Sequence, residues 1–168
     1  MNRRKPAQPY DVKNEHANQE DGITMSEVRE KAIAAKSAAR ALATLRADQK
    51  NHALHRMADA LITEQESILA ANERDLQRGR EAGLTASLLD RLALTPQRIA
   101  GIAEGLRLIA GLPDPVGEVI ETIERPNGLR IVNVRVPIGL IGIIYEARPN
   151  VTVDAAGLCL KTGNAVLL

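Results

Sequence analysis

The chain has 168 residues, of which 45% are hydrophobic, and its 22 Lys and Arg residues nearly balance its 21 Asp and Glu residues. This length can bury one good core, and the near-zero net charge gives no overall signal for nucleic acid or an anionic membrane. The single cysteine excludes an internal disulfide and a cysteine-rich zinc module. No run approaches the ~20 continuous apolar residues of a membrane-spanning helix. We therefore expect a soluble protein of a reducing compartment, with a cytoplasmic location.

The first 24 residues differ in composition from the rest. Residues 1–24 combine prolines with acidic and basic residues and carry almost no aliphatic pattern. Such a segment cannot offset the ordering entropy of a fold, so we predict a disordered N-terminal arm over 1–24. Met25 could then be the true start of the protein, or the arm could be a real extension, and the sequence leaves both open.

Residues 25–117 have the period of helices. Thr24 and Glu27 have the spacing of a capping box, and apolar residues then recur at steps of three and four, which predicts a long first helix. Its narrow apolar stripe consists of Val28, Ala32, Ala35, Ala39 and Leu42. A second helix is predicted from near Asp48, with Leu54, Met57, Ala58 and Leu61 on one face.

Two further helices are predicted in this part of the chain. One covers about 64–78 and should end before Gly79 or Gly83, because glycine readily adopts the left-handed conformation of a helix stop. Thr95 followed by Pro96 is typical of a helix start, and the helix that follows should end at Gly111.

Residues 118–136 have the composition of strands. The runs 118–124 and 129–136 are rich in Val, Ile and Thr, and the pair Asn127-Gly128 lies between them. This pattern predicts a β-hairpin with a type I′ turn. A lone two-stranded hairpin is marginal in water, so we expect it to pack on or pair with something else.

Residues 137–168 indicate a βαβ unit, and with it an α/β fold class. The run 138–145 is apolar at both alternating sets of positions, which is typical of a central parallel strand buried on both faces. Asn150 can cap a helix over 151–161, with Gly163 as its left-handed stop. A second apolar run, 165–168, starts another strand as the sequence stops. Gly139 and Gly142 lie inside the first strand, where we expect them to allow close backbone packing.

The loop 145–150 is the candidate site, because ligands of open α/β sheets bind outside the carboxyl ends of the strands. It places the Arg148 guanidinium and the Asn150 amide next to a helix N-terminus, a combination that favours an anion or an oxyanion. In the alternative interpretation, Glu146 pairs with Arg148 at the surface and Asn150 only caps the helix.

Other reactive side chains give weaker signals. Cys159 lies between two leucines in the middle of a predicted helix, so we interpret it as a buried structural thiol and not as a nucleophile. His52 and His55 could share a metal with Asp59, but no third ligand has a distinctive spacing, so we predict solvated histidines and no metal site.

The stretch 135–154, RVPIGLIGIIYEARPNVTVD, resembles the γ-glutamyl phosphate reductase family, also called glutamate-5-semialdehyde dehydrogenases. The run 158–168, LCLKTGNAVLL, continues the resemblance, and the stretches 68–76, 88–92 and 112–117 share it. Within the aldehyde dehydrogenase superfamily, the motif YEARPN at 145–150 is specific enough to point to this family. The likeness extends from about Met25 to Leu168 and leaves out residues 1–24.

The resemblance implies an aldehyde-dehydrogenase-like fold, of which this chain would be the N-terminal part. Residues 25–117 would be the helical part of the cofactor domain, and 118–136 a hairpin arm that pairs with another subunit. Residues 137–168 would be the first βαβ unit of the cofactor-domain sheet, truncated in its second strand. The expected partner is therefore a further copy of the chain, in a homo-oligomer.

The resemblance also implies a reaction: reduction of L-glutamyl 5-phosphate by NADPH to L-glutamate 5-semialdehyde and phosphate, in proline biosynthesis. A cysteine thiolate attacks the acyl phosphate, and hydride then reduces the thioester. The family's cysteine lies well downstream of YEARPN, so Cys159 does not match it and the fragment alone should be inactive. By likeness, Arg148 or Asn150 contacts the oxyanion or phosphate, and the cofactor lies against Ile144, Tyr145, Glu146 and Ala147.

A second hypothesis assigns the chain a function that is not enzymatic. The chain could be a complete, non-catalytic helical module whose hairpin mediates oligomerisation. That hypothesis requires the chain to be folded and soluble despite an unpaired terminal strand.

Overall fold

The structure, a computed structural model, describes residues 25–168, so the predicted arm and the capping residue Thr24 lie outside the described residues. The helices are α1 (Met25–Leu42), α2 (Ala47–Thr63), α3 (Gln65–Glu81), α4 (Ala86–Leu92), α5 (Pro96–Gly111) and α6 (Pro149–Lys161). The strands are β1 (Val119–Glu124), β2 (Arg130–Val134), β3 (Leu140–Gly142) and β4 (Ala165–Leu167).

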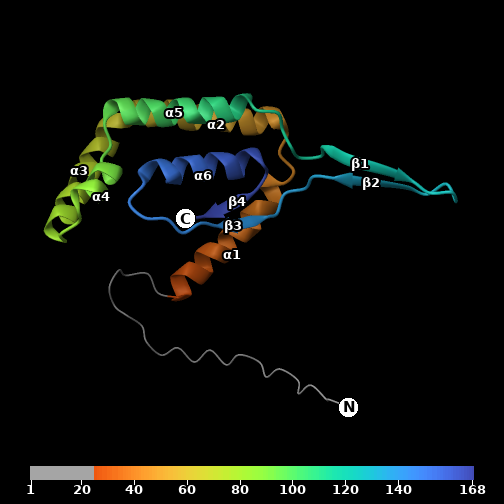
Figure 1. Ribbon diagram of the computed structural model, residues 1–168, viewed down its shortest axis with the longest axis horizontal. Helices are drawn as coiled ribbons and strands as arrows, with labels where there is room; N and C mark the ends of the chain where they lie inside the picture. Colours follow the sequence, from red (N-terminus) through yellow and green to blue (C-terminus); the bar gives the residue numbers. More distant parts are fainter. Residues whose placement is uncertain (1–24) are drawn as a thin grey trace, which may run out of the picture.

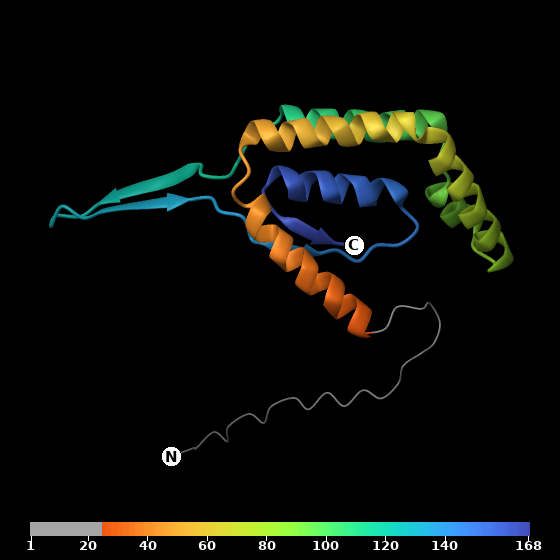
Figure 2. The same cartoon turned by 180° about the vertical axis from the view of Figure 1, so that it is seen from behind.

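The elements are stacked in layers around a small parallel sheet (Figure 1). Helix α6 covers one face of β3 and β4 and α1 covers the other, while α2 and α5 lie side by side above α6 (Figure 2). Helices on both faces of parallel strands are the arrangement expected of an α/β fold, which confirms the predicted fold class. No helix among residues 25–168 is both long and apolar enough to cross a membrane.

The core lies between α2, α5 and α6. Its fully buried members are Leu54, Ala58, Ala103, Leu106 and Ala110. Small residues let the helices approach closely: a Cβ atom on Gly157 of α6 would lie 2.7 Å from Leu106 Cδ2. The apolar face predicted for α2 is therefore confirmed, and the alanine-rich stripe of α1 likewise faces inward, with Ala39 buried.

The helix ends agree with the predicted signals in most places. The Thr95 hydroxyl accepts a hydrogen bond from the Arg98 N–H (3.1 Å), and Pro96 occupies the first helical turn. Helix α3 continues through Gly79 and ends at Glu81, with Gly83 at φ +77°. The short helix α4, capped by Thr85, was not predicted, because its 7 residues are too few for a periodic pattern.

The hairpin is present, but its predicted turn type is wrong. Strands β1 and β2 pair antiparallel, and a type I′ turn would need positive φ at both Asn127 and Gly128. Only Gly128 has it, at +81°. The Arg125 carbonyl accepts from the Gly128 N–H (2.9 Å), so Pro126 and Asn127 occupy the centre of the turn. Proline fixes φ near −65° and is favoured at the first central position of a turn. Pro126 therefore favours a turn with negative φ at that position, followed by the left-handed Gly128.

The hairpin projects away from the rest of the molecule (Figure 1). At its base, the Lys50 ammonium of α2 is 1% exposed and lies 2.6 Å from the Asp114 carboxylate, whose other oxygen accepts from the Val116 N–H. The nearby Lys161 ammonium of α6, also buried, donates to the Asn51 side chain (2.6 Å) and the Ala110 carbonyl (2.9 Å). The Lys50 contact joins the base of the hairpin to α2, and the Lys161 contacts join α6 to α2 and α5.

The βαβ unit is confirmed, with β3 and β4 parallel and Leu140 opposite Ala165. The first strand is shorter than predicted and is not buried throughout, since Ile138 is 82% exposed and Ile144 is completely exposed. The packing role predicted for its glycines is also wrong, because a Cβ atom on Gly139 or Gly142 would meet no atom within 4 Å. Gly139 is instead required by its backbone, at φ +115°. Gly163 is the left-handed helix stop predicted for α6, at φ +71°.

Candidate functional site

The loop between β3 and α6 carries the residues that the sequence singles out. The last ladder bond of β3 runs from the Ile143 N–H to the Leu167 carbonyl (2.9 Å), and the chain then leaves the sheet. Tyr145 is anchored by a short hydrogen bond between its hydroxyl and that of Thr152. Ala147 has φ +46°, a left-handed conformation that is uncommon for a residue other than glycine. Such outliers persist where the surrounding structure holds them, often at functional sites.

Helix α6 begins two residues earlier than predicted, so the capping role proposed for Asn150 is wrong. Arg148 occupies the N-cap position without a side-chain cap, and Pro149 takes the first helical position. Proline is favoured there because its missing N–H needs no partner. The Asn150 side chain is thereby free of the cap and donates a long hydrogen bond to the Asp154 carboxylate (3.5 Å).

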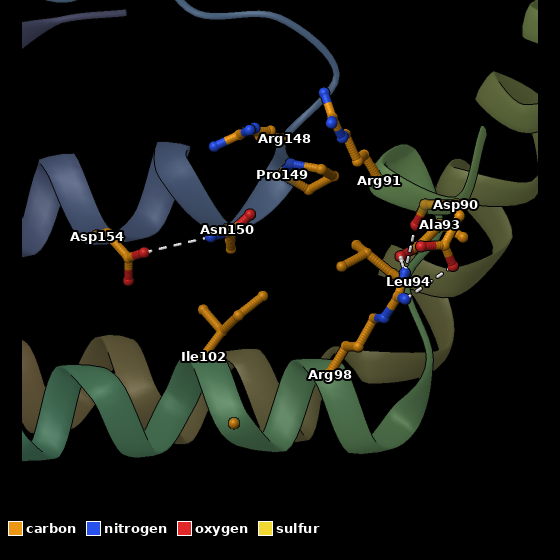
Figure 3. Close-up of a pocket in the computed structure, with 11 residues that line it drawn as sticks. Asp90, Arg91, Ala93, Leu94, Arg98, Ile102, Arg148, Pro149, Asn150 and Asp154 are labelled. Carbon is orange, nitrogen blue, oxygen red and sulfur yellow. Dashed lines mark hydrogen bonds and ion pairs between the residues drawn. The ribbon is translucent and has the colours of Figure 1, made fainter. Parts of the chain in front are cut away.

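Arg148 and Asn150 line one open pocket of about 520 Å³, together with residues of α4 and α5 (Figure 3). Its wall is formed by Asp90, Arg91, Ala93 and Leu94 on one side, by Arg98, Gly101 and Ile102 of α5, and by Arg148, Pro149, Asn150 and Asp154 at the start of α6. The structure thus brings the predicted pair of residues into one site.

The arginines of this pocket differ in whether they are paired. Arg98 donates to the Asp90 carboxylate (2.9 Å) and to the Asp90 and Ala93 carbonyls, so its charge is satisfied. The guanidinium groups of Arg148 and Arg91 have no ion pair or hydrogen bond with any of residues 25–168. The alternative in which Glu146 pairs with Arg148 is therefore not what the structure shows.

The residues predicted to contact a cofactor lie elsewhere. Ile144 lines a second, apolar hollow of about 410 Å³, between α1 and the carboxyl ends of β3 and β4. Its other lining residues are Val28, Lys31, Gly142, Ile143, Leu167 and Leu168. Tyr145, Glu146 and Ala147 form the connection from this hollow to the arginine pocket. The loop therefore separates two candidate binding regions.

The remaining reactive side chains, Cys159, His52 and His55, do not line the pocket of Arg148 and Asn150. Cys159 is buried, and burial raises the pKa of its thiol, which disfavours the nucleophilic thiolate. His52 and His55 are exposed, and no group of three His, Cys, Asp or Glu side chains that could hold a metal occurs among residues 25–168.

Sequence reasoning missed the half of the pocket that belongs to α4 and α5. Arg91 was noticed only within the family-like stretch 88–92, and nothing about its charge separates it from the other surface arginines of the helices. Its position becomes informative only in the folded chain, where Arg91 lies across the pocket from the start of α6 (Figure 3).

Comparison with known proteins identifies relatives of most of the chain. No family model matches it. It is 64% identical over 142 residues to γ-glutamyl phosphate reductase of Moorella thermoacetica, and 60% identical over 144 residues to that of Geobacillus kaustophilus. These alignments cover 84% and 86% of this chain, but only 34% and 35% of the two relatives. The chain thus spans about a third of the length of the curated relatives that it matches.

Solved structures give the same result. A γ-glutamyl phosphate reductase from Thermotoga maritima superposes with a TM-score of 0.81 at 47% identity, over 84% of this chain and 34% of that one. A γ-glutamyl phosphate reductase from Saccharomyces cerevisiae superposes with a TM-score of 0.79 at 34% identity, over 85% of this chain and 36% of that one. Over most of its length, the chain is therefore similar to about a third of several γ-glutamyl phosphate reductases.

Proposed function

We propose that the protein to which this chain belongs reduces L-glutamyl 5-phosphate to L-glutamate 5-semialdehyde and phosphate, with NADPH as hydride donor, as a step of proline biosynthesis. The observation that carries this proposal is the 64% identity, over 142 residues, to a relative named γ-glutamyl phosphate reductase. The unpaired Arg148 beside that loop supports it, because the substrate carries an acyl phosphate.

The proposed chemistry needs an anion site and a nucleophile. Arg148 offers a planar fork of donors, which suits a phosphate or a carboxylate. The first N–H groups of α6, next to it, favour the same negative charge. Asn150 adds a neutral amide that can donate to an oxyanion developing at the acyl carbon. We place the nucleophilic cysteine outside these 168 residues, because Cys159 is buried and does not line the pocket.

The cofactor region fits the other side of the loop. A nicotinamide cofactor supplies the hydride that the reduction requires. The apolar hollow beside Ile144 lies at the carboxyl ends of two parallel strands, where α/β folds bind nucleotides. Backbone N–H groups of Ile144, Glu146 and Ala147 make no hydrogen bond within the described part of the chain and can serve as donors. We propose that the helices and the βαβ unit together form part of this cofactor domain.

We further propose that the hairpin 118–136 pairs with another subunit. Its strands contact each other but project from the body (Figure 2). They expose apolar side chains at Val119, Ile120, Leu129, Ile131, Val132 and Val134. An exposed apolar edge is a ready template for pairing with another chain.

The function is tested in the complete gene product by the reverse reaction, in which NADP⁺, glutamate 5-semialdehyde and inorganic phosphate are supplied. We expect reduction of NADP⁺, followed by absorbance, only when both other substrates are present. Oligomerisation without any such activity would instead support the non-catalytic module. Reduction that needs no phosphate would assign the protein to aldehyde oxidation of a different kind.

A further inference from the structure

Arg91 is a charged residue of the pocket that the proposed chemistry has not used. It lies in the last turn of α4, on the wall opposite the start of α6, and its side chain rises toward the loop that leads into Arg148 (Figure 3). The arginine that lines the pocket from α5 is paired, since Arg98 lies 2.9 Å from the Asp90 carboxylate. Arg91 has no such partner among residues 25–168.

The pocket consequently presents two unpaired guanidinium groups on different elements. The Asp90 carboxylate is paired with Arg98. The other carboxylate that lines the pocket is that of Asp154, which accepts a hydrogen bond from Asn150. A cavity of about 520 Å³ is within the range of small-ligand sites, ~300–1,000 Å³. Its charge pattern is complementary to a small molecule with two separate anionic groups.

The two guanidinium groups have different surroundings, and we therefore expect them to bind different anions. Arg148 lies at the N-terminus of α6, where the helix dipole and free N–H groups favour a phosphate. Arg91 lies at the C-terminal end of a helix, where no such donors add to it, and its fork alone matches a carboxylate in bidentate geometry.

We propose that Arg91 binds the α-carboxylate of the substrate and so determines specificity for an amino-acid acyl phosphate, while Arg148 holds the phosphoryl end. This assignment rests on the proposed function and adds the residue that recognises the non-reacting end of the substrate. A site built around a charged partner rejects an analogue that lacks it, because the arginine is then left without its anion.

The reverse reaction separates the two roles, because the amino-acid aldehyde and inorganic phosphate are then independent substrates. In the complete gene product, Arg91→Ala should raise the KM for glutamate 5-semialdehyde by about 10- to 100-fold, as expected for a lost charged hydrogen-bond pair, and leave the KM for phosphate unchanged. With 4-aminobutanal, which has hydrogen in place of the α-carboxylate, wild type and Arg91→Ala should have the same kcat/KM. Arg91→Lys should recover part of the discrimination, and Arg74→Ala, at an exposed arginine on α3, is the matched control.

The outcomes distinguish this inference from the function on which it rests. Wild-type protein without phosphate-dependent activity would overturn the proposed function. The wild type could be active while Arg91→Ala keeps the full preference for glutamate 5-semialdehyde over 4-aminobutanal. That result would overturn the role of Arg91 and leave the proposed function standing. If Arg91→Ala does not fold, as judged by circular dichroism, Arg91→Gln is compared by the same ratio and decides the question.

Discussion

Arg148 is the N-cap residue of α6, and its guanidinium has no partner among residues 25–168. In the complete gene product, we expect Arg148→Ala to raise the KM for phosphate in the reverse reaction by about 10-fold or more, because a charge-assisted bidentate contact is lost. Steady-state kinetics at varied phosphate measures this. The control is again Arg74→Ala, and equal KM values for phosphate in both variants would show that Arg148 does not bind it.

Glycine is needed at position 139 because of its backbone conformation, and not because neighbouring atoms lie close to it. Its φ of +115° lies outside the conformations that side chains tolerate, and its N–H donates to the buried Asn164 side chain (2.7 Å). Its carbonyl accepts from the Ala165 N–H (2.8 Å), which holds the two strands in register.

We therefore expect Gly139→Ala to lower the free energy of unfolding by about 1–3 kcal/mol, the cost of a strained backbone. Gly142→Ala is the matched control, because Gly142 lies three residues further on, at the end of β3, without positive φ and with room for a methyl group. Denaturant unfolding measures both. The account of Gly139 fails if the two substitutions have the same effect.

The sequence was sufficient to predict Arg148 and Asn150 as site residues, but not the other residues that line their pocket. Composition and position next to a predicted helix were sufficient to find the loop. The role of Asn150 was misjudged because Pro149 can occupy the first helical position, which moves the cap to Arg148. Arg91 could not be found, because its importance depends on which elements pack against each other and not on its sequence neighbours.

Among the elements, the base of the hairpin is held by a buried ion pair. Lys50 is 1% exposed and Asp114 18% exposed, at 2.6 Å. Removing one member of a buried pair leaves the other charge unpaired, so we expect Lys50→Met to lower the free energy of unfolding by about 3 kcal/mol or more. Arg78→Met, which breaks the exposed pair between Arg78 and Asp75, should change it little. Equal effects in thermal or denaturant unfolding would contradict a stabilising role of the buried pair.

The same pair predicts a pH dependence. Burial opposes ionisation of Asp114, but the hydrogen bonds from Lys50 and the Val116 N–H, and the charge of Lys161, outweigh it and lower the pKa of this carboxyl. A carboxyl whose pKa is lower in the folded state stabilises the fold above its unfolded pKa, about 3.9, and loses that contribution as the pH falls through the folded value.

The periodic elements were predictable because their patterns are long. Helices α1, α2, α3 and α5 follow apolar repeats of three and four, and Thr95, Gly83 and Gly163 mark ends with a local physical cause. Helix α4 has 7 residues and no repeat to detect. The turn of the hairpin was misjudged because the Asn127-Gly128 pair was considered without the preceding Pro126, which excludes positive φ at its own position.

For the molecule as a whole, the hairpin is the surface that most clearly lacks a partner. Replacing two of its exposed apolar residues in the double variant Ile120→Lys, Val132→Lys should shift the complete gene product toward smaller assemblies, because charges oppose edge pairing. Light scattering after size-exclusion chromatography measures the mass. Leu108→Lys, at an exposed leucine on α5, is the control, and an unchanged mass of an oligomeric wild type in the double variant would contradict the proposal.

The overall α/β arrangement was predictable from one βαβ pattern, whereas the layering of α1, α2 and α5 around it was not. A stripe of alanines indicates that a helix is packed closely, but not against which neighbour. The close approach of α6 to α5 depends on Gly157, whose small size has no signature of its own within a helix. Which helices pack against each other depends on how their side chains fit together in three dimensions, and this fit cannot be determined from a single sequence.

The central claim, that this protein interconverts an acyl phosphate and an aldehyde, is tested most directly by trapping the acyl phosphate. In the reverse reaction, glutamate 5-semialdehyde, phosphate and NADP⁺ should give L-glutamyl 5-phosphate and NADPH in equal amounts. Hydroxylamine converts an acyl phosphate to a hydroxamate but also condenses with an aldehyde, so it is added only after the reaction has been stopped. The complete gene product should then yield γ-glutamyl hydroxamate in proportion to the NADPH formed. NADPH formation that is accompanied by glutamate without hydroxamate, or that proceeds without phosphate, would contradict the claim.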